Sequence, residues 1–181
     1  MSEVKKLLLH TCCAPCLIAP YQELKARGIE VTAFWYNVNI HPYTEYKARK
    51  EALEAYSASE GFPLIMRDEY GLEPFVKAVV SDIADRCRHC YETRLAATAK
   101  LAKDQGFEAF STTLLYSRYQ KHELIIETAE RYANIYAIPF FYEDWRPLWN
   151  KGIELSKAAG MYRQKYCGCI FSEQERYLGG K

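Results

Sequence analysis

The sequence lacks a long apolar run. Its first residues, MSEVKKLLLHTCC, contain three consecutive aliphatic residues, Leu7, Leu8 and Leu9. A secretory signal needs an apolar stretch of about 7–15 residues and a membrane helix needs about 20. The sequence therefore predicts neither, and we expect a cytoplasmic protein that does not associate with a membrane.

The sequence also lacks a strong excess of one charge and lacks the usual nucleotide-binding glycine motifs. Its 24 Lys and Arg residues against 23 Asp and Glu residues give a formal net charge of +1. This balance excludes a broadly basic nucleic-acid binder, although a local basic patch is compatible with it. Neither a P-loop nor a GxGxxG motif occurs, so no nucleotide cofactor is indicated. Hydrophobic residues make up 49% of the 181 residues, which suits one domain over residues 1–181 with a core that needs no disulfides.

Apolar segments of strand length alternate with amphipathic segments of helix length. The predicted strands are residues 6–10, 30–36, 62–67, 108–113 and 137–142. The predicted helices are residues 15–27, 44–60, 73–80, 90–104 and 122–134, followed by a helical C-terminal region at 147–177. In the second helix, Glu45 and Arg49 have the spacing of an i,i+4 ion pair. The alternation predicts an α/β fold, a doubly wound, Rossmann-like parallel sheet of about five strands.

Seven cysteines stand in three groups, and none lies outside a group. The groups are Cys12, Cys13 and Cys16, then Cys87 and Cys90, then Cys167 and Cys169. An odd number of thiols cannot pair completely, and clustered thiols in a reducing compartment are more often metal ligands or catalytic groups than disulfides. The first group directly follows a predicted strand, where such sheets bind their ligands. The pattern predicts one metal-dependent redox site with all seven cysteines as candidate metal ligands.

The cysteine count leaves alternatives open. Cys13 and Cys16 have the spacing of a thioredoxin-like pair, which makes Cys13 a candidate catalytic thiol. A structural zinc site uses four ligands, and so does one 4Fe-4S cluster. Either leaves three cysteines over, and these indicate a second metal ion or thiol catalysis.

Two further residues are candidates for the chemistry. Asp85 shortly precedes the second cysteine group and is a candidate general acid or oxygen ligand, although a capping or exposed carboxylate explains it equally well. Tyr116 lies in a hydroxyl-rich segment, residues 111–121, after the fourth predicted strand, and we include it as a candidate catalytic residue. Tyrosine rings of this segment are also suited to stacking on unpaired nucleobases.

Three motifs, in order, resemble the QueH family of epoxyqueuosine reductases. They are HTCCAPC at 10–16, RCRHCYETRL at 86–95 and YCGC at 166–169, and STTLLYSRYQ at 111–120 also looks like that family. The resemblance spans nearly the whole chain and implies a fold of the adenine-nucleotide alpha-hydrolase type. It also implies an oxidoreductase of queuosine synthesis that removes the epoxide oxygen of epoxyqueuosine in the tRNA anticodon loop. The implied cofactors are a 4Fe-4S cluster and an adjacent iron ion, without cobalamin.

On that chemistry we assign Cys87, Cys90, Cys167 and Cys169 to the cluster and place the first cysteine group near the second iron. Mixed assignments fit the spacing equally well. An external electron donor is expected, because removing the oxygen consumes two electrons. Candidate tRNA phosphate contacts are Arg88, Arg118, Lys121, Arg163 and Lys165, for each of which a solvated surface charge is the alternative. Two other functions stay open: a cluster enzyme that acts on sulfur in a nucleobase, and a zinc or thiol-disulfide redox protein.

Overall fold

A parallel sheet of four strands forms the centre of the molecule. The computed structural model describes residues 4–179, so both ends of the predicted domain, residues 1–3 and 180–181, lie outside the described residues. The strands are β1 (Lys6–His10), β2 (Glu30–Trp35), β3 (Leu64–Met66) and β4 (Ala109–Thr112), in the spatial order β3-β2-β1-β4. The strand order reverses between β1 and β4. Their carboxyl ends therefore form the switch point at which doubly wound sheets bind ligands.

The predicted fifth strand, residues 137–142, is reduced to a single bridge between Phe110 and Phe140. The amide of Phe110 donates to the carbonyl of Pro139 at 3.0 Å, and the amide of Phe141 donates to the carbonyl of Phe110 at 2.8 Å. Proline has no N–H to extend such a ladder. The α/β class is confirmed, with four strands instead of about five.

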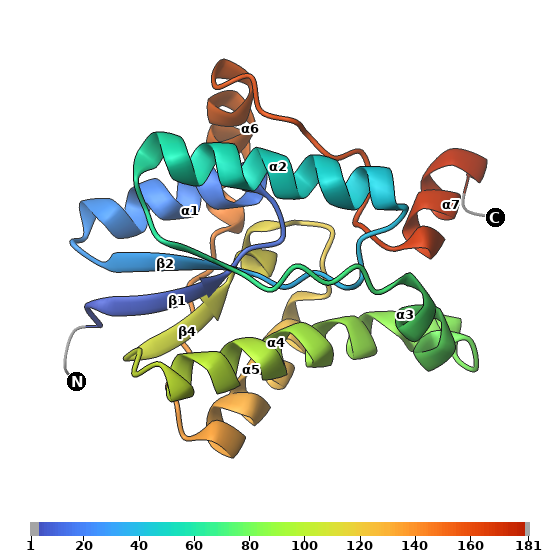
Figure 1. Cartoon of the computed structure of the whole chain (residues 1–181), viewed down its shortest axis with the longest axis horizontal. Coiled ribbons are helices and arrows are strands. Elements are labelled where there is room, and N and C mark those ends of the chain that lie inside the picture. The colour runs from blue at the N-terminus through green and yellow to red at the C-terminus, as the bar shows by residue number, and fades with distance from the viewer. Residues whose placement is uncertain (1–3, 180–181) are drawn as a thin grey trace.

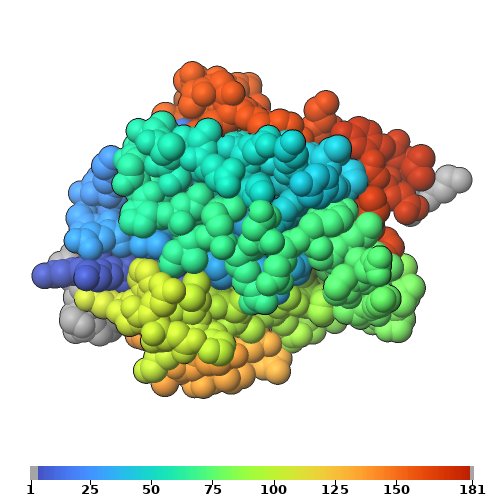
Figure 2. Space-filling model, in the orientation of Figure 1, coloured from blue at the N-terminus to red at the C-terminus, as the bar shows by residue number. Residues whose placement is uncertain are grey.

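Helices cover both faces of the sheet (Figure 1). One face carries α1 (Ala14–Ala26) and α2 (Tyr43–Glu60), and the other carries α4 (Arg86–Asp104) and α5 (His122–Tyr136). In the space-filling view, α2 and the residues that follow it up to the end of α4 hide most of the sheet (Figure 2). This two-sided cover explains the apolar run of β1, in which Leu7, Leu8 and Leu9 are all fully buried.

The remaining elements are short. They are α3 (Leu72–Val79), α6 (Trp149–Ala158), α7 (Ile170–Leu178) and the 3-10 helices η1 (Ile83–Asp85), η2 (Thr113–Tyr116) and η3 (Arg146–Leu148). The predicted helical C-terminal region is thus two helices, and the loop between them carries the third cysteine group. None of the described helices combines the length and the apolar character needed to cross a membrane.

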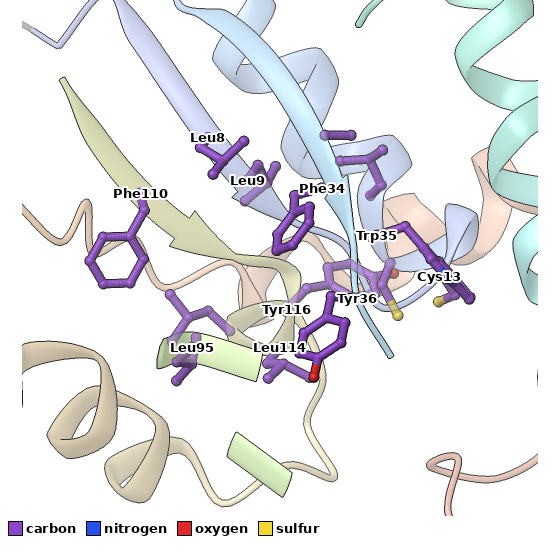
Figure 3. Close-up of a cluster of buried hydrophobic side chains, with 14 of the residues drawn as sticks. Leu8, Leu9, Cys13, Phe34, Trp35, Tyr36, Leu95, Phe110, Leu114 and Tyr116 are labelled. Atoms are coloured by element: carbon purple, nitrogen blue, oxygen red, sulfur yellow. The ribbon is translucent and has the colours of Figure 1, made fainter. Parts of the chain in front are cut away.

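The core lies between the sheet and the helices of both faces. Figure 3 shows Phe34 and Phe110 from the strands together with Leu95 of α4 and Leu114 of η2, all at most 2% exposed. Each such side chain contributes about 1.5–3 kcal/mol by leaving water. Cys13 belongs to the same buried cluster, so the first cysteine group stands on the rigid part of the molecule.

Candidate metal centre

The first cysteine group lies where β1 ends and α1 begins. The sulfur atoms of Cys12, Cys13 and Cys16 all lie within 4.8 Å of one another. Cys13 is the residue that caps α1, and Pro15 lies in the first turn, a position that proline favours. The positive end of the helix dipole is therefore close to the thiols and favours their ionised form. Three converging thiols offer three protein ligands to one metal ion, as in sites that leave a fourth position open.

Thr113 connects this group to the neighbouring strand across the switch point. The amide of Cys12 donates to Thr113 Oγ1 at 3.1 Å, and Thr113 Oγ1 donates to Cys12 Sγ at 3.3 Å. Hydrogen bonds from Cys13, Cys16 and Thr113 hold the pKa of Cys12 well below its usual range, against the effect of burial. Burial and the neighbouring Cys12 raise the pKa of Cys13. One thiol of the group therefore ionises readily and opposes ionisation of the next, an opposition that a bound cation removes.

Gln164, from the loop before α7, contacts two of these thiols. Its Nε2 lies 2.9 Å from Cys13 Sγ and 3.4 Å from Cys16 Sγ. Its Oε1 is buried without a hydrogen-bond partner among the described residues. The sequence gives no local signal for this role, because the contact joins residues about 150 positions apart.

The other four cysteines line one pocket. Cys87 and Cys90 come from α4, and Cys167 and Cys169 come from the loop before α7; the other lining residues are Asn39, Phe75, Arg86, Tyr91 and Gln120. The helix begins at Arg86 and not near Cys90 as predicted, because Asp82 accepts a hydrogen bond from the Asp85 amide and starts the chain turning earlier. Cys87 and Cys90 are three residues apart in sequence. Because both now lie within α4, their thiols share one helix face. Two segments distant in sequence thus supply a set of four thiols.

Two buried residues hold the loop of Cys167 and Cys169 in place, one of them through its backbone as well as its side chain. The amide of His41 donates to Gly168 O at 2.8 Å, and His41 Nδ1 accepts from the Ile170 amide at 3.3 Å. Arg49 donates to the carbonyl of Cys167 at 2.9 Å and to that of Tyr166 at 3.0 Å, while its Nε pairs with Glu45 at 2.6 Å. The predicted pair of Glu45 and Arg49 is therefore confirmed, but its further role in fixing the loop comes from tertiary structure.

Arg94 is a buried cation between the two sets of thiols. It is 2% exposed, and it donates from Nη2 to Cys90 Sγ at 2.8 Å and from Nε to Cys90 O at 3.1 Å. Burial lowers the pKa of Arg94, but negative charge on Cys90, Cys12 and Cys167 outweighs burial and raises it. The side chain therefore responds to charge in both cysteine groups.

Comparison with known proteins agrees with the motifs. A family model described as "Epoxyqueuosine reductase QueH" matches residues 7–175. A protein of that name from Dehalococcoides mccartyi is 40% identical over 172 residues, covering 95% of this chain and 94% of the relative. Another from Thermotoga maritima is 36% identical over 181 residues, covering 94% and 91%. This chain belongs to the QueH family. The resemblance carried by the three cysteine motifs is confirmed.

Within this QueH fold, the two non-cysteine candidates for catalysis lie in different environments. Asp85 is on the surface, where its carboxylate accepts from Arg88 Nε at 3.2 Å. Tyr116 is buried, and its hydroxyl donates to the carbonyl of Trp149 at 2.9 Å. Burial, together with negative charge on Cys16 and Cys13, raises the pKa of Tyr116, so the hydroxyl keeps its proton.

The five candidate tRNA contacts of this QueH chain are all surface residues. Arg88 already pairs with Asp85 at 3.2 Å and with Glu127 at 3.3 Å. The other four form no ion pair within residues 4–179 and come from two loops beside the cysteines: Arg118, Lys121, Arg163 and Lys165. These four side chains are therefore available to pair with the phosphates of a ligand.

Proposed function

We propose that this chain reduces epoxyqueuosine in tRNA to queuosine with a 4Fe-4S cluster and an adjacent iron ion. Cys87, Cys90, Cys167 and Cys169 would hold the cluster, and the first cysteine group would hold the iron. Membership of the QueH family supports the reaction. The observation that carries the division of ligands is geometric: four thiols line one pocket, and the other three form a separate group at the switch point.

The pocket of four thiols fits a cluster in its donor chemistry. Four thiolates are the usual protein ligands of a 4Fe-4S cluster. Arg94 already directs an N–H group at Cys90 Sγ. Arg86 Nε is buried at the same pocket without a hydrogen-bond partner among the described residues, and cluster sulfur would accept from it. Two guanidinium groups would also offset the negative charge of a thiolate-bound cluster.

Converting an epoxide into an alkene takes up two electrons and two protons and releases water. The bound cofactors would supply one-electron transfer and a Lewis acid for the epoxide oxygen. The electrons have to come from an external donor. Cys167 is the thiol of the pocket whose side chain is exposed, so an external donor reaches the pocket most directly from that side.

The chain itself has to supply or relay protons, for which Cys13, Asp85 and Tyr116 are the candidates. Tyr116 is the most suitable of the three to donate a hydrogen bond to the substrate oxygen and to relay a proton to it, because it is buried near the first cysteine group and its hydroxyl is protonated. With substrate bound, the Tyr116 hydroxyl would donate its hydrogen bond to the substrate oxygen instead of to the Trp149 carbonyl. Asp85 is held by Arg88 on the surface, and Cys13 is needed as a ligand.

The deciding experiment is an anaerobic reaction followed by nucleoside mass spectrometry. Purified protein with reconstituted iron and sulfide is incubated with tRNA that contains epoxyqueuosine and with a chemical reductant. We expect queuosine in place of epoxyqueuosine, and no product without reductant. Unchanged epoxyqueuosine together with a change in a sulfur-containing nucleoside would favour the sulfur-acting alternative. Colourless protein with zinc in excess of iron would favour the zinc or thiol-disulfide alternative.

A further inference from the structure

Tyr119 presents its ring to solvent beside the pocket of four thiols. At 84% exposure it is the most exposed large hydrophobic side chain among residues 4–179. A single exposed aromatic residue is common on protein surfaces. The surroundings of this ring, and not its exposure alone, point to a ligand.

Trp149 supports the ring from the side of the protein. The two ring centres are 5.6 Å apart at an interplanar angle of 77°, an edge-to-face contact. Trp149 also packs on the buried ring of Tyr116, with centres 5.3 Å apart at 30°. The guanidinium of Arg118 lies 6.0 Å from the centre of the Trp149 ring. A row of aromatic groups thus runs from the interior to the surface and ends at Tyr119.

The loop that carries Tyr119 is fixed on both sides of it. The amide of Tyr119 donates to Ser117 Oγ at 3.3 Å. The next residue, Gln120, accepts from the hydroxyl of Tyr91 at 2.6 Å and donates from Nε2 to Cys167 Sγ at 3.2 Å. The backbone of Tyr119 is therefore one residue away from a side chain that contacts a pocket thiol.

Basic side chains without acidic partners lie in the same loop as the ring and in the loop before Cys167. Arg118 and Lys121 belong to the same loop, and Arg163 and Lys165 to the loop before Cys167; in the described part of the chain no carboxylate pairs with any of them. Exposed rings interleaved with unpaired cations are typical of single-stranded nucleic-acid binding, in which bases stack on the rings and phosphates contact the cations. Paired bases of a duplex offer no free face for such stacking.

We propose that Tyr119, supported by Trp149, stacks an unpaired base of the tRNA anticodon loop that flanks the nucleotide being modified. This inference rests on the proposed function, because it takes tRNA as the substrate. A flanking base is assigned because the modified nucleotide has to reach the thiols, whereas the Tyr119 ring stands outside them at the rim. The aromatic pair therefore selects substrates in which this neighbour is unpaired.

The test uses a synthetic anticodon stem-loop RNA that carries 2-aminopurine next to the modified position. The fluorescence of 2-aminopurine falls when it stacks on an aromatic ring, so one titration measures both affinity and stacking. We expect Tyr119→Ala and Tyr119→Leu to weaken binding by roughly ten-fold or more and to give a brighter complex than the wild type. Tyr119→Phe and Tyr119→Trp keep a ring and should behave as the wild type.

The matched control is Tyr136→Ala, which removes a tyrosine at the opposite end of α5, about 20 Å along the helix axis. Its affinity should equal that of the wild type. Equal affinity and equal fluorescence for the wild type, Tyr119→Ala and Tyr119→Leu would overturn the stacking proposal alone. A wild-type protein that does not bind the stem-loop would contradict the proposed function as well. Fully paired RNA should bind weakly and with the same affinity to all variants. If Tyr119→Ala weakened the binding of paired RNA as much as the binding of the stem-loop, the assignment to an unpaired base would also be overturned.

Discussion

The buried guanidinium of Arg94 donates a 2.8 Å hydrogen bond to the sulfur of Cys90. No carboxylate pairs with this arginine within residues 4–179, and the largest of the charges that raise its pKa against burial are those of the thiolates Cys90 and Cys12. A buried cation without an anion is strongly unfavourable. The arrangement is stabilising when the surrounding thiols are ionised, as they are when they bind a metal.

We expect Arg94→Met to have opposite effects on the loaded and the metal-free protein. In the loaded protein, losing the positive charge and the N–H donors should lower the midpoint potential, because both stabilise the more negative reduced state. In the metal-free protein the variant should be at least as stable as the wild type, because it replaces a buried charge with an apolar side chain. Redox titration and thermal unfolding measure the two effects, with Arg94→Lys as the control that keeps the charge. An equal loss of stability in both forms would assign Arg94 a purely structural role.

The division of the cysteines predicts two different iron phenotypes. Cys87→Ser should abolish the visible absorbance of the cluster, because it removes one of the four pocket thiols. Cys12→Ser should keep that absorbance and lower the iron-to-sulfide ratio, because it removes a ligand of the separate iron. Anaerobic reconstitution, followed by absorbance and by iron and sulfide analysis, distinguishes them. Loss of the cluster absorbance in Cys12→Ser but not in Cys87→Ser would contradict the division.

Gln164 should affect the iron of the first cysteine group and leave the cluster intact. Its amide contacts both Cys13 and Cys16, and losing such an outer contact typically weakens metal binding by about 10–100-fold. We expect Gln164→Leu to lose one iron to a chelator at a concentration that leaves the wild type loaded. Gln105→Leu, at the exposed end of α4, is the matched control. Equal chelator resistance of the wild type and Gln164→Leu would refute this role.

Acid should destabilise the metal-free fold through His41. Burial lowers the pKa of His41 from 6.5 to about 4, and the neutral ring accepts from the Ile170 amide and bonds to the Val38 carbonyl. Because the folded pKa lies below the unfolded one, this stability is fully present above pH 6.5. It is lost as the pH falls toward 4, since the unfolded chain takes up the proton first. The expected loss is on the order of 1–3 kcal/mol. Urea unfolding across this range should show a weaker pH dependence for His41→Gln, and an unchanged dependence would exclude His41 as the responsible group.

Binding to tRNA should weaken steeply with salt. Each phosphate neutralised on a single strand adds about −0.7 to the slope of log affinity against log salt concentration. Arg163→Gln should make the slope less steep by the contribution of about one phosphate contact. Arg88→Gln is the matched control, because Arg88 is already paired with Asp85 and Glu127. An affinity that does not change with salt would count against the whole basic surface.

Local pattern was sufficient to predict the elements of the sheet but not the contacts around the thiols. The apolar run of β1 and the helix stop at Gly61 depend on neighbouring residues, and both appear where the sequence places them. The early start of α4 follows the 3-10 helix η1, which Asp82 caps, and the weak fifth strand depends on Pro139. Gln164 had no assigned role in the sequence, because its partners are fixed by the path of the C-terminal loop.

The attachment of that loop has a consequence for the lifetime of the enzyme. His41 and Arg49 hold its backbone, while the other two thiols of the pocket stand on α4. A cofactor bound by all four thiols would cross-link the loop to the helix. Oxidative destruction of the cofactor would then remove that link and raise the rate of amide hydrogen exchange in residues 161–169. Loss of such a cofactor would thereby become a local unfolding event, which a protease can recognise.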